Sequence, residues 1–290
     1  MSTLAYEGPN AQQIEYWNEQ RGRTWVAERD ALDAQIAPFG RKAMDRAAFA
    51  ANERVLDVGC GCGQTTLEIA RRVGAGGEVC GADLSTVMLT VARDAARAAG
   101  VGNVRFVEAD AQTYAFPPRA FDVLFSRFGV MFFADPTAAF SNLGGALRSG
   151  GRLAFVCWRS LPENPWMMVP MAAAFQILAP PPPPGPNEPG PFAFADAERV
   201  RAILTGAGFI DVACEAHDAQ MVVGGADGGV EKTAEFMLRL GPTAAAVREA
   251  GPAKIAEVAA VVAEALRAYH VPGTGVRMAA ATWIVSARRP

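Results

Sequence analysis

The chain has 290 residues, of which 51% are hydrophobic and 20% are charged, and its formal net charge is −3. These values indicate one soluble globular domain of generous size, or one domain with insertions. They argue against a nucleic-acid-binding protein, because no lysine- or arginine-rich stripe appears. The N-terminus lacks a basic region followed by an apolar core, so no secretory signal is expected. The longest nearly uncharged apolar stretch, Trp166 to Ala179, is too short to span a bilayer, so no stable membrane insertion is expected.

The cysteines indicate the compartment in which the protein works. They are Cys60, Cys62, Cys80, Cys157 and Cys214. An odd count without a disulfide-like framework fits a reduced cytoplasm, so a cytoplasmic protein is expected. Cys60 and Cys62 are two residues apart, but no nearby Cys or His completes a zinc pattern, and no metal site is predicted.

Strands and helices alternate along most of the chain. Apolar runs predict strands at residues 54–59, 78–83, 104–108, 121–126, 151–158, 209–215 and 282–288. Helices are predicted at residues 64–73, 85–99, 135–147 and 196–206. Ser85, Asp135 and Asp196 stand where they would cap three of these helices. The alternation predicts an α/β fold, a doubly wound Rossmann-like sheet with its ligand site at the carboxyl ends of the strands.

Three segments fall outside this pattern. Residues 1–50 are predicted to be helical, and residues 230–270 contain two amphipathic helices, near 236–240 and 255–266. Residues 159–195 include five consecutive prolines, Pro180 to Pro184, which indicate either a stiff surface connector or a ligand for a polyproline-binding partner. Insertions placed after strands usually form a cap over the active site.

The predicted organisation is therefore one domain over residues 1–290. Its parts are an N-terminal helical cap (1–50), a cofactor-binding core (52–158), a proline-rich cap insertion (159–195), and a C-terminal half of the core (196–290) with a helical insertion (230–270).

The glycine cluster in "VLDVGCGCGQTT", residues 55–66, decides which cofactor the fold would take. A dinucleotide fingerprint has the spacing Gly-x-Gly-x-x-Gly, and its third glycine lets helix and strand approach closely. Here the spacing is Gly59, Gly61, Gly63, and Gln64 occupies the third fingerprint position. A glutamine side chain suits that contact poorly, which weakens the alternative of an NAD(P)-dependent oxidoreductase.

The segments "VLDVGCGCGQTTLEIA", "GADLS", "VEADAQ" and "FDVLFSRFGVMFFADP" resemble, in order and spacing, the motifs of class I S-adenosylmethionine-dependent methyltransferases. The likeness continues through "LRSGGRLAFVCW" and "ILTGAGF", so it covers residues 52–158 and 195–215. In particular the chain resembles the small-molecule type found in ubiquinone and menaquinone biosynthesis. The resemblance implies a seven-stranded, mostly parallel sheet whose last strand is antiparallel, and S-adenosyl-L-methionine as cofactor.

The resemblance also implies a set of cofactor-binding residues. They are Tyr16, Asp57, Gly59, Gly61, Gly63, Asp83, Leu84, Met88, Asp110, Ala111 and Ser126. The glycine loop would face the methionyl carboxylate and Asp57 would orient the methionyl ammonium, while Asp83 would accept hydrogen bonds from both ribose hydroxyls. Leu84 and Met88 would pack against adenine, and Asp110 with the Ala111 backbone would recognise its amine.

Each of these roles has a structural alternative. Asp83 and Asp110 would serve equally as turn or helix caps at strand ends, and Leu84 and Met88 as core residues. The two acids follow consecutive strands downstream of the glycine loop, and this arrangement favours the cofactor-binding interpretation.

Methyl transfer is an in-line displacement, so the protein must align the acceptor nucleophile, the methyl group and the sulfur, and must exclude water. Tyr16, Trp17 and Phe128 are candidates for cation–π contact with the sulfonium. His217 is the candidate catalytic base because it lies just past the predicted sixth strand, although a surface histidine is the alternative. His270 is placed at a helix end, where it would complement the helix dipole.

The predicted acceptor is a small hydrophobic or aromatic molecule and not a nucleic acid. Trp17, Phe128, Trp158 and Trp166 are the candidate substrate-binding residues, and nearby methionines would complete an adaptable apolar wall. The alternative is that these side chains pack the cap onto the core. The remaining functional alternative is a protein that binds S-adenosylmethionine without methyl transfer. No oligomeric state is predicted.

Overall fold

The protein is built around one twisted sheet. The structure, a computed structural model, describes residues 4, 7–183, 185, 187–226 and 229–290. Its strands are β1 (Arg54–Val58), β2 (Glu78–Asp83), β3 (Val104–Glu108), β4 (Phe121–Arg127), β5 (Leu147–Trp158), β6 (Ile210–Val223), β7 (His270–Val271) and β8 (Gly275–Arg288). The order is β3-β2-β1-β4-β5-β8-β6, and β7 pairs with β8 as a short addition.

The first five strands in this order are parallel, and β8 runs antiparallel to both of its neighbours, β5 and β6. The predicted mostly parallel, Rossmann-like sheet of seven main strands with an antiparallel last strand is therefore confirmed. The strand order reverses direction at β1 and β4, and this switch point is where doubly wound folds bind their ligands.

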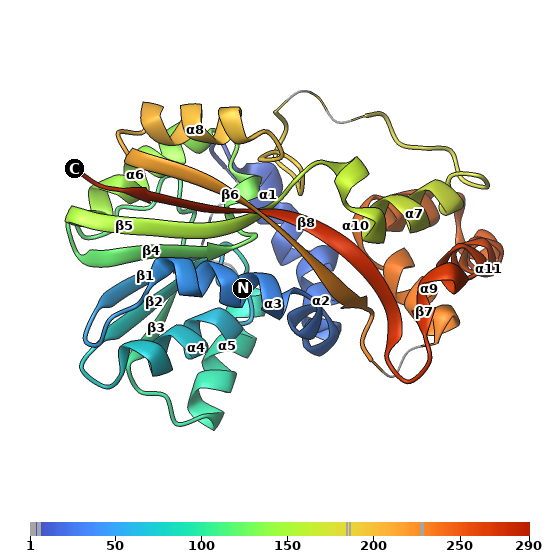
Figure 1. Ribbon diagram of the computed structural model, residues 1–290, viewed down its shortest axis with the longest axis horizontal. Coiled ribbons are helices and arrows are strands. Elements are labelled where there is room, and N and C mark those ends of the chain that lie inside the picture. The colour runs from blue at the N-terminus through green and yellow to red at the C-terminus, as the bar shows by residue number, and fades with distance from the viewer. Residues whose placement is uncertain (1–3, 5–6, 184, 186, 227–228) are drawn as a thin grey trace.

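Eleven α-helices lie in the described part of the chain. They are α1 (Ala11–Asn18), α2 (Gln20–Ala27), α3 (Arg29–Ala47), α4 (Gln64–Val73), α5 (Thr86–Ala98), α6 (Pro136–Ala146), α7 (Pro165–Ala174), α8 (Ala197–Gly206), α9 (Val230–Leu238), α10 (Gly241–Ala250) and α11 (Ile255–Leu266). In Figure 1, α6 and α8 cover one face of the sheet and α3, α4 and α5 cover the other.

Local capping chemistry explains where three helices begin. The predicted caps are confirmed, because Ser85 accepts from the Met88 N–H, Asp135 from the Ala138 N–H, and Asp196 from the Glu198 N–H. Pro136 occupies the first turn of α6, where its missing N–H costs nothing.

The last two long strands extend far beyond the predicted ranges. β6 and β8 are each 14 residues long and stay paired from Ile210↔Arg288 to Val223↔Val276. Their outer halves are rich in alanine and polar residues, which are weak strand formers, so the sequence pattern did not predict them. The paired outer halves of β6 and β8 carry the C-terminal helices beyond the ends of the other strands.

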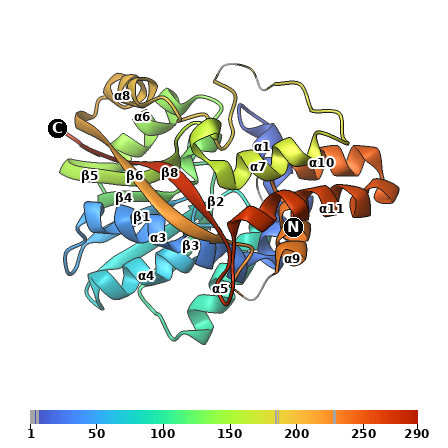
Figure 2. The same cartoon turned by 45° about the vertical axis from the view of Figure 1, so that its right-hand side comes forward.

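Helices α7, α9, α10 and α11 gather beyond the strand ends, at the right of Figure 1 and again in Figure 2. α11 packs against α7 and α9, and α10 packs against α7 and α9. The predicted pair of helices between 230 and 270 is corrected to three, because α10 forms between the two predicted ones. Pro180 to Pro183 are exposed, and Pro184 lies outside the described residues.

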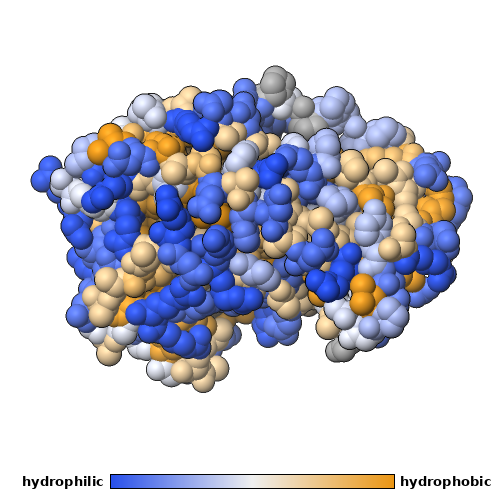
Figure 3. All heavy atoms as spheres, viewed as in Figure 1, coloured by the Kyte–Doolittle hydropathy of each residue, from blue (hydrophilic) through white to orange (hydrophobic). Residues whose placement is uncertain are grey.

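On the face shown in Figure 3, hydrophilic side chains dominate over the sheet half, and apolar atoms appear in small separate groups. In the described part of the chain, no helix is both long and apolar enough to cross a membrane.

Candidate active site

Three glycines shape the loop between β1 and α4. Gly59, Gly61 and Gly63 have φ angles of +68°, +54° and +85°, a region that favours glycine. A Cβ on Gly59 would stand 2.7 Å from the Gly129 Cα, and one on Gly63 would stand 2.8 Å from the Ala92 Cβ. A Cβ on Gly61 would meet only a methionine sulfur, at 3.9 Å. Two of the glycines therefore allow close packing, and Gly61 keeps space open.

Asp83 ends β2 directly opposite this loop. Its Oδ2 accepts from the Gly61 N–H at 2.8 Å and its Oδ1 accepts from the Ser85 N–H at 2.8 Å. Asp83 is only 8% exposed. Burial raises the pKa of its carboxyl to about 6, although the hydrogen bonds from both N–H groups favour the ionised form. Each carboxylate oxygen can accept a further hydrogen bond, so Asp83 has capacity for two hydroxyl donors.

Asp110 lies in the loop after β3 and is held by the N-terminal segment. The Asn10 Nδ2 donates to both of its carboxylate oxygens, at 2.9 and 3.0 Å, and the Gln112 N–H donates to Oδ1. The Asn10 Oδ1 accepts from the Ala134 N–H at 2.8 Å. Asn10 thus joins two strand-end loops, a role that sequence reasoning missed because its partners are 100 or more residues away.

The junction of α1 and α2 closes over the turn that follows Asp83. The Asn18 Nδ2 donates to the Leu84 carbonyl at 2.9 Å, and its Oδ1 accepts from the Thr86 N–H at 2.9 Å. The Ser85 hydroxyl donates to the Trp17 carbonyl at 2.7 Å. The first helices are therefore fixed to the same loop that carries the Asp83 carboxylate.

Asp57 and Ser126 lie beneath the glycine loop and outside the pocket wall. The Asp57 Oδ2 accepts from the hydroxyls of Thr65 and Thr66, each at 2.7 Å, while its buried Oδ1 has no hydrogen-bond partner among the described residues. Burial raises the pKa of the Asp57 carboxyl. The Ser126 hydroxyl donates to the Val58 carbonyl at 2.7 Å, so it ties the ends of β1 and β4 together.

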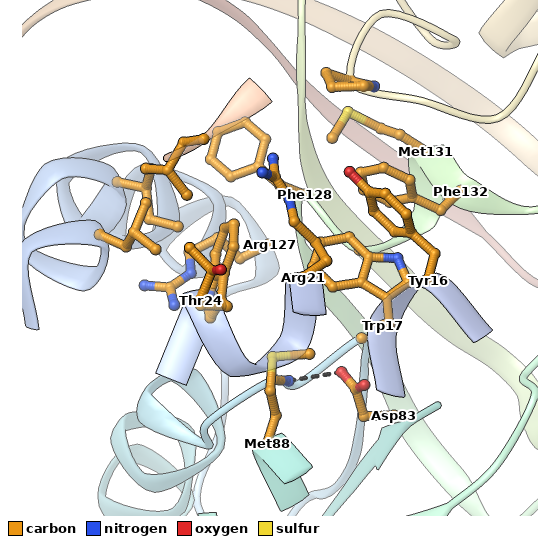
Figure 4. A pocket seen from close by; sticks show the side chains of 18 of the residues that line it. Tyr16, Trp17, Arg21, Thr24, Asp83, Met88, Arg127, Phe128, Met131 and Phe132 are labelled. Atoms are coloured by element: carbon orange, nitrogen blue, oxygen red, sulfur yellow. Dashed lines mark hydrogen bonds between the residues drawn. The ribbon is translucent and has the colours of Figure 1, made fainter. Parts of the chain in front are cut away.

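A single cavity of about 550 Å³ joins the strand ends to the helical cap (Figure 4). The candidate residues that line it are Tyr16, Trp17, Gly59, Gly61, Asp83, Leu84, Met88, Asp110, Ala111, Phe128, Trp158 and Trp166. Its cap end is apolar and is lined by Met167, Pro170, Met171, Phe236, Met237 and Leu240. Four candidates, Asp57, Gly63, Ser126 and His217, are outside the lining.

Stacked aromatic rings form one wall of this cavity. Phe128, which has a φ of +60°, stacks on Trp158 with ring centroids 4.1 Å apart, and Trp166 lies 5.0 Å from Trp158. The Trp166 Nε1 donates to the Asn164 Oδ1 at 3.0 Å, which fixes the indole at the start of α7. Figure 4 shows Tyr16, Trp17 and Phe132 on another side of the same space.

The prediction that His217 lies just past the sixth strand is wrong. β6 continues to Val223, so His217 is a mid-strand residue, and its ring packs edge-on against Phe39 with centroids 6.0 Å apart. Burial and nearby Lys42 lower its pKa. His270 begins β7 and also directly follows the 3₁₀ helix Arg267–Tyr269 that continues α11, so its predicted place at a helix end is confirmed. Neither histidine lines the described pocket.

Charged side chains complete the wall, and sequence reasoning missed them. Arg127 forms an ion pair with Asp33 at 2.6 Å and donates a hydrogen bond to the Gln64 Oε1. Gln64 therefore has a hydrogen-bond partner at the position where a dinucleotide fingerprint has glycine.

The cysteine of the glycine loop is neutral, because burial raises the pKa of the Cys62 thiol to about 12. Among the described residues, no cluster of His, Cys, Asp and Glu is placed to hold a metal ion.

Comparison with known proteins identifies the family. Residues 55–151 match a family of methyltransferase domains. The chain is 37% identical over 150 residues to the demethylmenaquinone methyltransferase of Thermus thermophilus, a match that covers 50% of this chain and 67% of that protein. The chain belongs to the class I S-adenosylmethionine-dependent methyltransferases. S-adenosylmethionine is the cofactor of this family, and the dinucleotide alternative is set aside.

Two further methyltransferases show how far the likeness extends. The aklanonic acid methyltransferase of a Streptomyces species is 37% identical over 120 residues, which are 41% of this chain and 54% of that protein. The chain thus spans about half the length of that relative. Phosphoethanolamine N-methyltransferase 2 of Haemonchus contortus, solved with S-adenosyl-L-methionine, shares the fold with a TM-score of 0.60 at 18% identity, covering 98% of this chain and 60% of that one.

The strand-end part of the pocket fits the methyltransferase cofactor in two respects. Gly61 leaves open a space that a side chain at this position would enter, and the partly free oxygens of Asp83 match a pair of hydroxyl donors. Asp57, whose Oδ1 has no hydrogen-bond partner among the described residues, is fully buried behind the loop and does not line this pocket.

Proposed function

We propose that the chain transfers a methyl group from S-adenosylmethionine to a small, apolar acceptor held between the strand ends and the helical cap. When bound, the cofactor supplies a methyl group already activated on a sulfonium. The continuous cavity carries the proposal, because one space is lined by the glycine loop and Asp83 at one end and by apolar cap side chains at the other.

In this proposal each end of the cavity has its own task. Asp83 would hold the ribose hydroxyls, the glycine loop and Asp57 would face the amino-acid part, and Asp110 with Ala111 would face adenine. Leu84 and Met88 would pack on the adenine ring, and Ser126 and Gly63 would keep the loop in place without touching the cofactor.

The cap would align the acceptor and exclude water. Trp17, Phe128, Trp158 and Trp166 would form its aromatic wall, and Tyr16 with Trp17 and Phe128 would be near the sulfonium. We propose no histidine base, because the described lining contains neither histidine. The chain would act mainly by positioning the acceptor nucleophile in line with the methyl group.

The proposed acceptor is a small molecule rather than a nucleic acid, and the proposed compartment is the cytoplasm. The net charge of −3 and the apolar cap end of the cavity support the first statement. The second is supported by five free cysteines, four of them buried.

The test measures release of S-adenosylhomocysteine from S-adenosylmethionine in the presence of a panel of apolar aromatic and aliphatic acceptors. The proposal expects release that depends on one acceptor class and falls at least about tenfold in Asp83→Ala, which loses charge-assisted bonds. Release by no member of the panel from a folded protein that binds the cofactor would contradict methyl transfer to such acceptors.

A further inference from the structure

Arginines are prominent in a pocket that is otherwise apolar at its cap end. Those in the lining are Arg21, Arg127, Arg239 and Arg248. Arg127 is paired with Asp33, and Arg239 with Glu28 at 2.8 Å. Arg21 and Arg248 have no salt bridge to any described residue. Two positive charges in the wall therefore have no ion-pair partner in the described part of the chain.

Arg21 is the more enclosed of these two. Its Nε is buried and has no hydrogen-bond partner in the described residues, and its guanidinium lies 5.8 Å from the centroid of the Tyr16 ring. Figure 4 shows Arg21 reaching from α2 into the space beside Tyr16 and Trp17. Leaving a guanidinium donor buried and unpaired is unfavourable, and a carboxylate is the partner that its planar fork binds best.

Arg21 belongs to α2 and lies beside the rings of Tyr16 and Trp17. Arg248 of α10 lines the same pocket. Burial, together with the positive charge of Arg248, lowers the pKa of Arg21. Glu15 and Glu19 also line the pocket, but they are exposed, and water solvates them.

We infer that Arg21, with Arg248 at the rim, binds a carboxylate carried by the acceptor, so that the acceptor is an apolar acid. This inference rests on the proposed function and deepens it. The apolar part of the molecule would lie against Met167, Met171, Met237 and Leu240, while its carboxylate accepts from the Arg21 guanidinium. The carboxylate orients the acceptor, and the cap supplies the burial energy.

The test uses neutral analogues of the same shape. The full-length protein is first saturated with S-adenosylhomocysteine. Naphthoate, biphenyl carboxylate and their neutral amides, naphthamide and biphenyl carboxamide, are then titrated into it separately, and the affinity of each acid is compared with that of its amide. The variants are Arg21→Met, which keeps an apolar stem, and Arg23→Met as matched control, because Arg23 is exposed on the same helix and does not line the pocket. Titration of S-adenosylhomocysteine itself is the separate measure of the cofactor site.

We expect the wild-type protein and Arg23→Met to bind at least one acid about tenfold or more tightly than its amide. Arg21→Met reduces that preference to about twofold or less while S-adenosylhomocysteine binds as before. A wild-type protein without preference for any acid, or an Arg21→Met protein that keeps the preference, overturns the inference. So does a loss of S-adenosylhomocysteine binding in Arg21→Met, which would assign the arginine to the cofactor. Failure of the wild-type protein to bind S-adenosylhomocysteine would instead overturn the proposed function.

Discussion

Asp83 is buried enough to hold a proton below about pH 6, yet its proposed task requires the ionised form. Ribose hydroxyls donate more strongly to a carboxylate than to a carboxylic acid, so bound cofactor would lower the pKa of Asp83. We expect the affinity for S-adenosylhomocysteine to be constant above about pH 6 and to fall by up to about tenfold per pH unit below it. Calorimetric titration across this range measures the effect. Asp83→Asn should give a flat profile, and an equally steep profile in that variant would assign the proton to another group.

The glycine loop offers a contrast between packing and space. Gly59→Ala would place a methyl group 2.7 Å from backbone atoms, whereas Gly61→Ala meets only a sulfur at 3.9 Å. Both substitutions place a residue with a Cβ at a positive φ, which destabilises the fold by about 1–2 kcal/mol. We expect Gly59→Ala to lose several kcal/mol of unfolding free energy, and Gly61→Ala to lose about 1–2 kcal/mol but at least about tenfold in cofactor affinity. Denaturant unfolding and S-adenosylhomocysteine titration separate the two. Normal cofactor binding by Gly61→Ala would mean that the cofactor does not approach this loop.

At this scale the sequence predicted the residues whose roles are local. The glycines and the two acids after β2 and β3 could be found because strand, turn and helix cap are close together in the chain. Asn10, Asn18 and Arg21 could not be found, because their positions depend on how the first helices pack on loops about 70 to 120 residues away. His217 was misplaced because β6 was predicted to end too early.

Asn18 connects two elements, α1 and the turn between β2 and α5, through two hydrogen bonds. Asn18→Ala should lose about 1–3 kcal/mol of unfolding free energy and should also weaken cofactor binding several-fold, because the first helices would no longer be fixed over Asp83. Asn103→Ala is the matched control. Asn103 directly precedes β3 and donates to the carbonyls of Ala70, Gly74 and Gly77, so it lies at the amino ends of the strands, opposite to the ends that carry the site. It should lose similar stability with unchanged affinity, and equal losses of affinity in both variants would contradict a specific role for α1.

Hydrophobic periodicity and N-cap residues predicted most elements of the sheet half. They did not predict the helices and strand extensions that build the helical cap. α4, β2 and β3 have the predicted bounds, because each is a short apolar or amphipathic run between glycines or caps. The outer halves of β6 and β8 stay extended because they pair with each other, a long-range condition that no local pattern records. α10 was missed for a related reason, since it packs on α7 and α9 from a segment with weak periodicity.

The whole molecule combines a methyltransferase sheet with two distant groups of helices, α1–α3 from the N-terminus and α7 with α9–α11 from the insertions. Both groups contribute to the wall of one cavity. The central claim is that this cavity has separable ends, one for the cofactor at Asp83 and one for the acceptor at the cap.

Calorimetric titration of S-adenosylhomocysteine into three proteins tests this claim most directly: the wild type, Asp83→Ala, and Met171→Ala at the cap end. We predict micromolar binding to the wild type, a loss of about ten- to a hundredfold in Asp83→Ala, and a change within about twofold in Met171→Ala, with all three folded. Undetectable binding to the folded wild type, or an Asp83→Ala protein that binds as tightly as the wild type, would contradict the account.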